Sequence, residues 1–206
     1  MALAGCNTSE GTSSTPASAS ATTPSASAPA PATPQASGPS ELRALEVNGA
    51  RVLSSQFGDL NGDGRSDALV VVDPASEGQA AGKGPSRTVL LLIRDADGHL
   101  QRVAQNDRII PCERCGGLAG DPFGYARIDK EGFTLVTEGG SRERWGNEFT
   151  FKFATEQEAW ILEVVRRGVR DTATGATRKF TLTAKQLGKV KFEDFDPSTL
   201  PSARLP

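Results

Sequence analysis

The stretch FTFKFATEQEAWILEVVR, residues 149–166, decides the fold class. Its first five residues alternate phenylalanine with polar residues, which is the period of a β-strand with one buried face. The polar segment ATEQEA, residues 154–159, interrupts the pattern, and a second apolar run follows at once. Two such runs joined by a short turn pair as antiparallel strands. The stretch therefore predicts a β-hairpin.

The same pattern recurs on both sides of this hairpin. Turn signals include Asp97-Gly98 and DKEG, residues 129–132, and no helix-length period appears, although TAKQLG, residues 183–188, is able to form one turn. Further short apolar runs cover residues 68–72, 88–94, 100–105, 133–138 and 179–184. We therefore predict an all-β domain built as an antiparallel meander, in a β-sandwich, barrel-like or partial-propeller arrangement.

The N-terminal segment has a different composition. Residues 7–40 are almost entirely Ser, Thr, Ala and Pro, with Glu10 as the one charge. Such a segment cannot bury enough apolar surface to offset its ordering entropy, so we expect it to be disordered. Residues 41–206 suffice for a single domain. The net charge of the chain is −2, so no large basic field favours nucleic acid as a partner.

The first six residues, MALAGC, suggest a cellular address. Leu3-Ala4-Gly5-Cys6 looks like a bacterial lipobox, in which the cysteine receives the lipid. We expect residues 1–5 to be the remnant of a signal peptide, truncated or misassigned, and residues 6–40 to be a lipidated tether. The alternative is a chance match. Because no segment approaches the roughly 20 apolar residues of a membrane span, we predict a periplasmic protein anchored by lipid alone, to the outer membrane.

The other two cysteines lie in PCERCGG, at Cys112 and Cys115. If Cys6 is lipidated, this even remainder in an oxidising compartment favours a disulfide that fixes a turn. A structural zinc site needs four Cys or His ligands, and the chain adds only His99 to the two thiols. A redox-active pair normally opens a helix, whereas the glycine-rich residues that follow are typical of a loop.

An acidic segment, FGDLNGDGRSDALVVV, covers residues 57–72. Its oxygen-bearing residues alternate as in the calcium loop of an EF-hand, with a glycine at position six and a backbone carbonyl at position seven. Position twelve is Val70 instead of a bidentate glutamate, which excludes the helix-loop-helix version and leaves a loop that runs into a strand. The expected calcium ligands are Asp59, Asn61, Asp63, Arg65 through its carbonyl, and Asp67. The alternative is a hydrated turn that binds nothing.

This segment resembles the calcium loops of FG-GAP and VCBS-type β-propeller repeats. A propeller repeats the motif once per blade, whereas this chain carries it once, so the resemblance implies the calcium loop and not a full propeller. Carboxylates that converge without a cation repel each other, and oxygen-only ligation favours calcium over zinc or copper.

A second resemblance covers residues 115–165 and LGKVKFEDFD, residues 187–196. These segments are similar to a family of bacterial periplasmic lipoproteins that pair one FG-GAP-like loop with a C-terminal β-meander. Its members are similar in fold to inhibitors of invertebrate-type lysozyme. They act as immunity proteins against peptidoglycan-hydrolase effectors delivered by a bacteria-killing type IV secretion system. The resemblance implies that the partner is a secreted, lysozyme-like peptidoglycan hydrolase.

An inhibitor of such an enzyme should offer cations and hydrogen-bond donors to a cleft that carries two carboxylates. The segment EGGSRERWGNE, residues 138–148, is predicted as a loop between two strands, and Tyr125 lies on a second predicted loop. The candidate target-binding residues are Tyr125, Ser141, Arg142, Arg144 and Trp145. The alternatives are a packing role for Trp145 and a solvated pair for the two arginines.

Catalysis is not expected. The single histidine, His99, follows the Asp97-Gly98 turn, so no histidine-based triad has a natural place. Two other functions remain open beside the inhibitor: a calcium-stabilised structural or adhesive module of the FG-GAP type on the envelope, and, less favoured, an envelope hydrolase.

Overall fold

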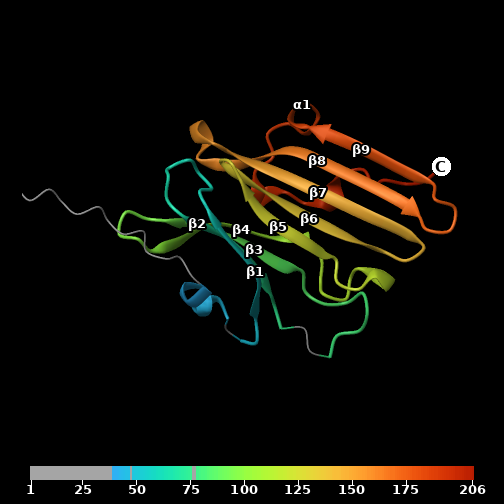
Figure 1. The fold of residues 1–206 in the computed structure, drawn as a ribbon, viewed down its shortest axis with the longest axis horizontal. Coiled ribbons are helices and arrows are strands. Elements are labelled where there is room, and N and C mark those ends of the chain that lie inside the picture. Colours follow the sequence, from blue (N-terminus) through green and yellow to red (C-terminus); the bar gives the residue numbers. More distant parts are fainter. Residues whose placement is uncertain (1–38, 47, 76–77) are drawn as a thin grey trace, which may run out of the picture. The chain divides into compact units, whose positions relative to one another are not determined.

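The computed structural model describes residues 39–46, 48–75 and 78–206, and this part of the chain forms two antiparallel sheets (Figure 1). The first sheet contains β1 (Arg51–Gly58), β2 (Asp67–Asp73), β3 (Arg87–Arg94) and β4 (Leu100–Ile110). The second contains β5 (Phe123–Asp129), β6 (Gly132–Gly140), β7 (Glu143–Ala154), β8 (Ala159–Asp171) and β9 (Thr177–Thr183). Strands pair in chain order in both sheets. The predicted all-β meander is therefore confirmed.

Short helical turns connect and flank the strands. They are η1 (Pro39–Leu45), η2 (Gly117–Ala119), η3 (Thr155–Gln157), α1 (Ala184–Leu187), η4 (Phe192–Asp194) and η5 (Pro197–Thr199). The single turn α1 starts with a capping box, in which Thr183 and Gln186 satisfy each other's backbone N–H groups. Among the described residues, no helix has the length and apolar character needed to cross a membrane.

The inner faces of the two sheets share one core. Of the sandwich, barrel-like and partial-propeller arrangements that the sequence left open, the protein therefore adopts the sandwich. Neither sheet closes on itself, which rules out a barrel. Phe133, Phe149 and Phe151 of the second sheet are fully buried and pack against Phe192 and Phe195 near the C-terminus, with ring centroids 5.2–5.7 Å apart. The alternation of FTFKF thus places phenylalanine in the core, as predicted.

The opposite face of the first sheet is also covered. Val70 and Leu90 form a second apolar cluster there with Leu42 of η1. A strand that is buried on both faces has an unbroken apolar run in place of alternation. This double burial explains the sequence ALVVV in β2.

The sequence did not predict two of the strands, β1 and β5, and it predicted a loop at residues 138–148 where the structure has mostly strand. β1 and β5 are edge strands of mixed composition, so their pairing depends on a neighbouring strand more than on their own periodicity. Residues 138–148 are mostly strand, because β6 and β7 continue in register up to the pair Gly140–Arg144. Tyr125 accordingly lies in β5 and not on a loop.

The boundary of the folded part also differs slightly from the prediction. The turn η1 begins at Pro39, two residues inside the predicted tether of residues 6–40. Cys6, the predicted signal remnant and the tether up to residue 38 lie outside the described residues.

Candidate functional site

The acidic loop between β1 and β2 is organised around Asp59. One carboxylate oxygen, Oδ1, accepts hydrogen bonds from the backbone N–H groups of Asn61 (3.2 Å), Gly62 (2.6 Å) and Asp63 (3.2 Å), and Oδ2 accepts one from Gly64 (2.8 Å). The two glycines have φ angles of +84° and +81°, which side chains with a Cβ rarely adopt. The aspartates and glycines of the sequence therefore enforce a tight loop.

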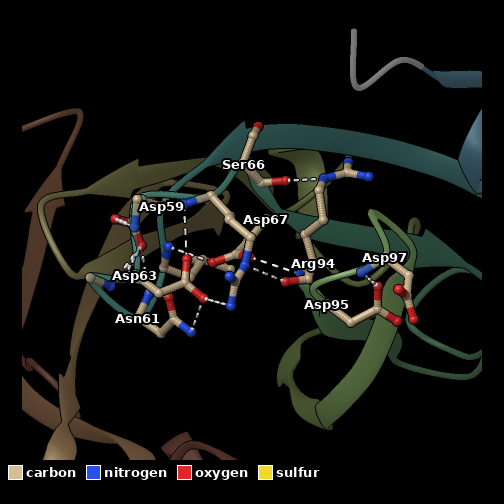
Figure 2. A network of polar contacts seen from close by, with 12 residues as sticks. Asp59, Asn61, Asp63, Ser66, Asp67, Arg94, Asp95 and Asp97 are labelled. Carbon is tan, nitrogen blue, oxygen red and sulfur yellow. Dashed lines mark hydrogen bonds and ion pairs between the residues drawn. The ribbon is translucent and has the colours of Figure 1, made fainter. Parts of the chain in front are cut away.

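This loop brings three carboxylates together. One oxygen from each of Asp59, Asp63 and Asp67 lies within 4.8 Å of the other two. Figure 2 shows these side chains grouped where β1 ends and β2 begins. A donor set made of oxygen atoms alone fits a hard cation such as Ca²⁺ and offers nothing to a thiophilic metal.

Asp67 is the buried member of this triad. Its Oδ2 accepts a hydrogen bond from the backbone N–H of Leu60, and its Oδ1 accepts one from that of Arg94, both at 2.9 Å. Burial raises the pKa of Asp67, and the charges of Asp63 and Asp59 raise it further. The two backbone hydrogen bonds lower the pKa, but they do not outweigh this rise. Each oxygen of the Asp67 carboxylate has a second lone pair that can bind a cation. A bound cation would relieve the repulsion among the three carboxylates.

The other two predicted ligands contact Asp63 through their side chains. Asn61 Nδ2 donates to Asp63 Oδ2 at 3.0 Å, and Arg65 Nη2 donates to the same oxygen at 2.9 Å. Burial raises the pKa of Asp63, but the backbone N–H of Arg65, the amide of Asn61 and the guanidinium outweigh it, so the net shift is downward. Arg65 thus supplies positive charge beside the triad, and a divalent cation has to share Asp63 with it or displace it.

The acidic loop connects both sheets and η1. Its Leu60 is fully buried in the shared core, and the carbonyl of Leu60 accepts a hydrogen bond from Trp160 Nε1 of β8 at 2.9 Å. Arg94 donates to the carbonyl of Ser66 at 2.8 Å (Figure 2). It also forms a two-point ion pair with Glu41 of η1. These long-range partners, Arg94 and Trp160, could not be assigned from the sequence.

The β6–β7 turn carries two of the predicted target-binding residues, Ser141 and Arg142. Arg142 donates to Asp171 Oδ2 at 2.9 Å, so its charge is already paired. This hydrogen bond, with the backbone N–H groups of Thr174 and Ala173 on the other carboxylate oxygen, lowers the pKa of Asp171 to about 2. The turn is therefore tied to the end of β8.

The low pKa of Asp171 predicts a pH effect on stability. A carboxyl group whose pKa is depressed by folding contributes stability at neutral pH, which is lost as pH falls from about 4 to about 2. In thermal melts across this range, we expect Asp171→Asn to lose less stability than the wild type. Arg142→Gln, which removes the partner, should shift the profile in the same direction. Parallel profiles for wild type and Asp171→Asn would contradict the assignment.

A short disulfide loop lies against this turn. Cys112 and Cys115, the pair that the sequence predicts, are joined by a disulfide. The backbone N–H of Gly140 donates to the carbonyl of Gly116 at 2.8 Å, which ties the loop to the end of β6. Leu118 of η2 is 85% exposed, although it is a large apolar residue in a braced loop. A lone leucine in a glycine-rich segment gives no sequence signal, and Leu118 was therefore missed.

The remaining predicted target-binding residues lie on different faces of the second sheet. Trp145 packs on Gly139, because a Cβ there would approach the indole Cζ2 to 2.4 Å. Arg144 precedes it in the strand and faces the opposite way. Tyr125 is 42% exposed on β5 beside the guanidinium of Arg127. The five candidates thus form no single cluster, and the prediction that Trp145 lies on a loop is wrong.

Comparison with known proteins finds no matching family model, no matching curated protein and no matching solved structure. The function is therefore argued from the residues and geometry of this chain.

Proposed function

We propose that the protein is a periplasmic lipoprotein that binds and inhibits a peptidoglycan hydrolase and so acts as an immunity protein. The observation that carries the proposal is the exposed Leu118 in the turn η2, which directly follows the Cys112–Cys115 disulfide. An aliphatic side chain can anchor an interface by filling a pocket on the partner, and it loses less conformational freedom on binding when its backbone is already held. The resemblance of residues 115–165 to the lipoprotein inhibitors supports the same role.

The bracing of this loop suits an inhibitor. Ordering a loop on binding costs conformational entropy, and a loop that is rigid beforehand avoids most of that cost. The disulfide and the hydrogen bond from Gly140 to Gly116 hold the backbone before Leu118, and the hydrogen bond from Glu138 N–H to the carbonyl of Pro122, at 2.9 Å, holds it after Leu118. Ser141 lies at the adjoining turn, where its hydroxyl offers a donor to an acidic cleft, and the ion pair of Arg142 with Asp171 holds that turn in place.

We assign calcium to the acidic loop in a structural role. Asp59, Asp63 and Asp67 would hold the ion, and Asn61 and the carbonyl of Arg65 would complete the oxygen ligands. The ion supplies charge that offsets the repulsion among the three carboxylates. Because the loop contacts the shared core through Leu60 and η1 through Arg94, calcium would stabilise the sandwich.

A second candidate function has its own support. A calcium-stabilised structural or adhesive module needs the acidic loop but no protruding anchor. The position of the loop, with contacts to both sheets, favours this candidate. It differs from the inhibitor in predicting no effect on any hydrolase.

The deciding experiment is a lysis assay on purified peptidoglycan. An invertebrate-type lysozyme and a panel of secreted bacterial hydrolases are each incubated with cell wall, with and without the protein, and turbidity is followed. We expect protection against at least one enzyme. Absence of protection throughout would favour the structural module, and clearing by the protein alone would identify an envelope hydrolase.

We expect Leu118→Asp to weaken inhibition by about tenfold or more, because a charge replaces an interface anchor. The melting temperature should stay unchanged, since the side chain is almost fully exposed. Val103→Asp is the matched control, because Val103 is an exposed apolar residue on β4 of the other sheet. Equal inhibition by the Leu118 and Val103 variants would contradict the anchor role.

A further inference from the structure

A shallow groove lies on the outer face of the second sheet, the face away from the core. Its volume is about 570 Å³, and it is lined by residues of β6, β7, β8 and β9, which Figure 1 shows side by side. Gly146 of β7 and Gly168 of β8 are paired directly across the two strands and form its floor. The missing side chains of this glycine pair create the hollow.

The fold does not require glycine at position 146. Its φ angle lies outside the left-handed region, and a Cβ built there would meet nothing within 4 Å. Gly168 is tighter, since a Cβ would lie 3.2 Å from Lys179 Cγ. Glycine weakens a strand interior and often marks the close approach of a ligand or of another backbone. An open glycine inside a long strand, at a position paired on both sides, therefore points to an occupant above it.

Three positively charged side chains lie beside the floor, those of Arg144, Arg170 and Lys179, and no carboxylate among the described residues forms an ion pair with them. Arg144 is paired directly opposite Arg170, and Lys179, opposite Gly168, lies diagonally next to Arg170. Like charges in directly opposed positions of a sheet repel each other. Arg144 donates to the carbonyl of Gly140 at 3.3 Å, and within the described part of the chain neither Arg170 nor Lys179 has an ion-pair partner. An anion bound between them would relieve this repulsion.

The opposite border of the groove is acidic. Glu138 of β6 lies opposite Gly146, and Glu148 of β7 forms an ion pair with Arg166. A polymer with a phosphate on every unit would meet these carboxylates as well as the cations. A peptide instead spaces its carboxylates apart and brings backbone N–H donors for the glutamates. The charge distribution therefore favours a peptide.

We propose that this groove binds an extended acidic peptide segment of a partner protein. The peptide backbone lies over Gly146 and Gly168, and its carboxylates face Arg144, Arg170 and Lys179. The proposal needs neither the calcium loop nor Leu118, so it stands whether or not the partner is a peptidoglycan hydrolase.

The test measures binding of a fluorescein-labelled peptide of alternating glutamate and serine residues to the whole protein by fluorescence anisotropy, at low and at physiological ionic strength. We expect binding that weakens with salt. Arg170→Glu should weaken it about tenfold or more. Gly146→Leu should block it with no loss of thermal stability, because the added side chain enters open space. Gly146→Ala should retain part of the affinity.

Arg102→Glu on β4 is the matched control, since it makes the same charge change at an exposed position of the other sheet. Loss of binding in Arg170→Glu and Gly146→Leu, with Arg102→Glu unchanged, supports the groove. Equal weakening in the Arg102 and Arg170 variants, or no binding by the wild type, overturns it. Tighter binding of inorganic polyphosphate with the same variant dependence would replace the peptide by a phosphate polymer. If Gly146→Leu fails to fold, the Arg170 and Arg102 pair still decides.

Discussion

Arg87→Met should destabilise the protein by about 3–5 kcal/mol, the cost typical of breaking a buried ion pair by removing one partner. The Arg87 side chain is 0% exposed and bridges two carboxylates. Its Nε donates to Asp73 Oδ1 at 2.9 Å, while Nη1 and Nη2 donate to Asp121 at 2.5 and 2.8 Å. The substitution removes the donor to Asp73 Oδ1 at the buried end of β2 and both donors to Asp121, while Arg51 still contacts Asp73 Oδ2.

Arg51→Met provides a matched control for this effect. Arg51 also contacts Asp73, at 2.7 Å, but its side chain is 57% exposed. Exposed ion pairs contribute about 0–1 kcal/mol, so this variant should remain close to the wild type. Denaturant unfolding followed by tryptophan fluorescence measures both. Similar losses in the two variants would show that Arg87 does not hold the fold in the way its contacts suggest.

Local patterns sufficed to predict much of the fold. The alternation around Phe149 and Phe151 and the turn at Asp97-Gly98 act between neighbouring residues, and both appear in the structure. The edge strands β1 and β5 depend on pairing with a partner strand, which a period count does not detect. The alternative arrangements were separated only by the structure, in which two open sheets share one core.

The candidate sites divide in the same way. The spacing of Asp59, Asp63 and Asp67 within one short loop is a local property, and these carboxylates do converge. The groove over Gly146 and Gly168 arises from the register of two strands, so the sequence alone contains no sign of it. A site within one turn can thus be predicted from its residue types, whereas a surface that spans several strands can be predicted only once the strand pairing is known.

Calcium at about 10 mM, which is 100 times a dissociation constant of about 10⁻⁴ M, should raise the melting temperature of the wild type by roughly 5–10 °C relative to excess chelator. A ligand at 100 times its dissociation constant stabilises the folded state by about 2.7 kcal/mol, and a domain of this size gains roughly 2–4 °C per kcal/mol. Extracellular calcium modules bind in the range of about 10⁻⁴ to 10⁻³ M, so micromolar calcium is too little to test the site.

Asp63→Ala should abolish this calcium dependence, because it removes one of the three converging carboxylates and the acceptor that Arg65 contacts. Asp97→Ala, in the neighbouring exposed turn, should keep the full shift, since Asp97 lies outside the triad. The comparison uses the difference between calcium and chelator for each variant, so a general loss of stability in Asp63→Ala does not affect it. Identical wild-type melting curves in chelator and in millimolar calcium would refute the calcium assignment. The contacts of Asp67 with Leu60 and Arg94 would then be sufficient to hold the loop without an ion.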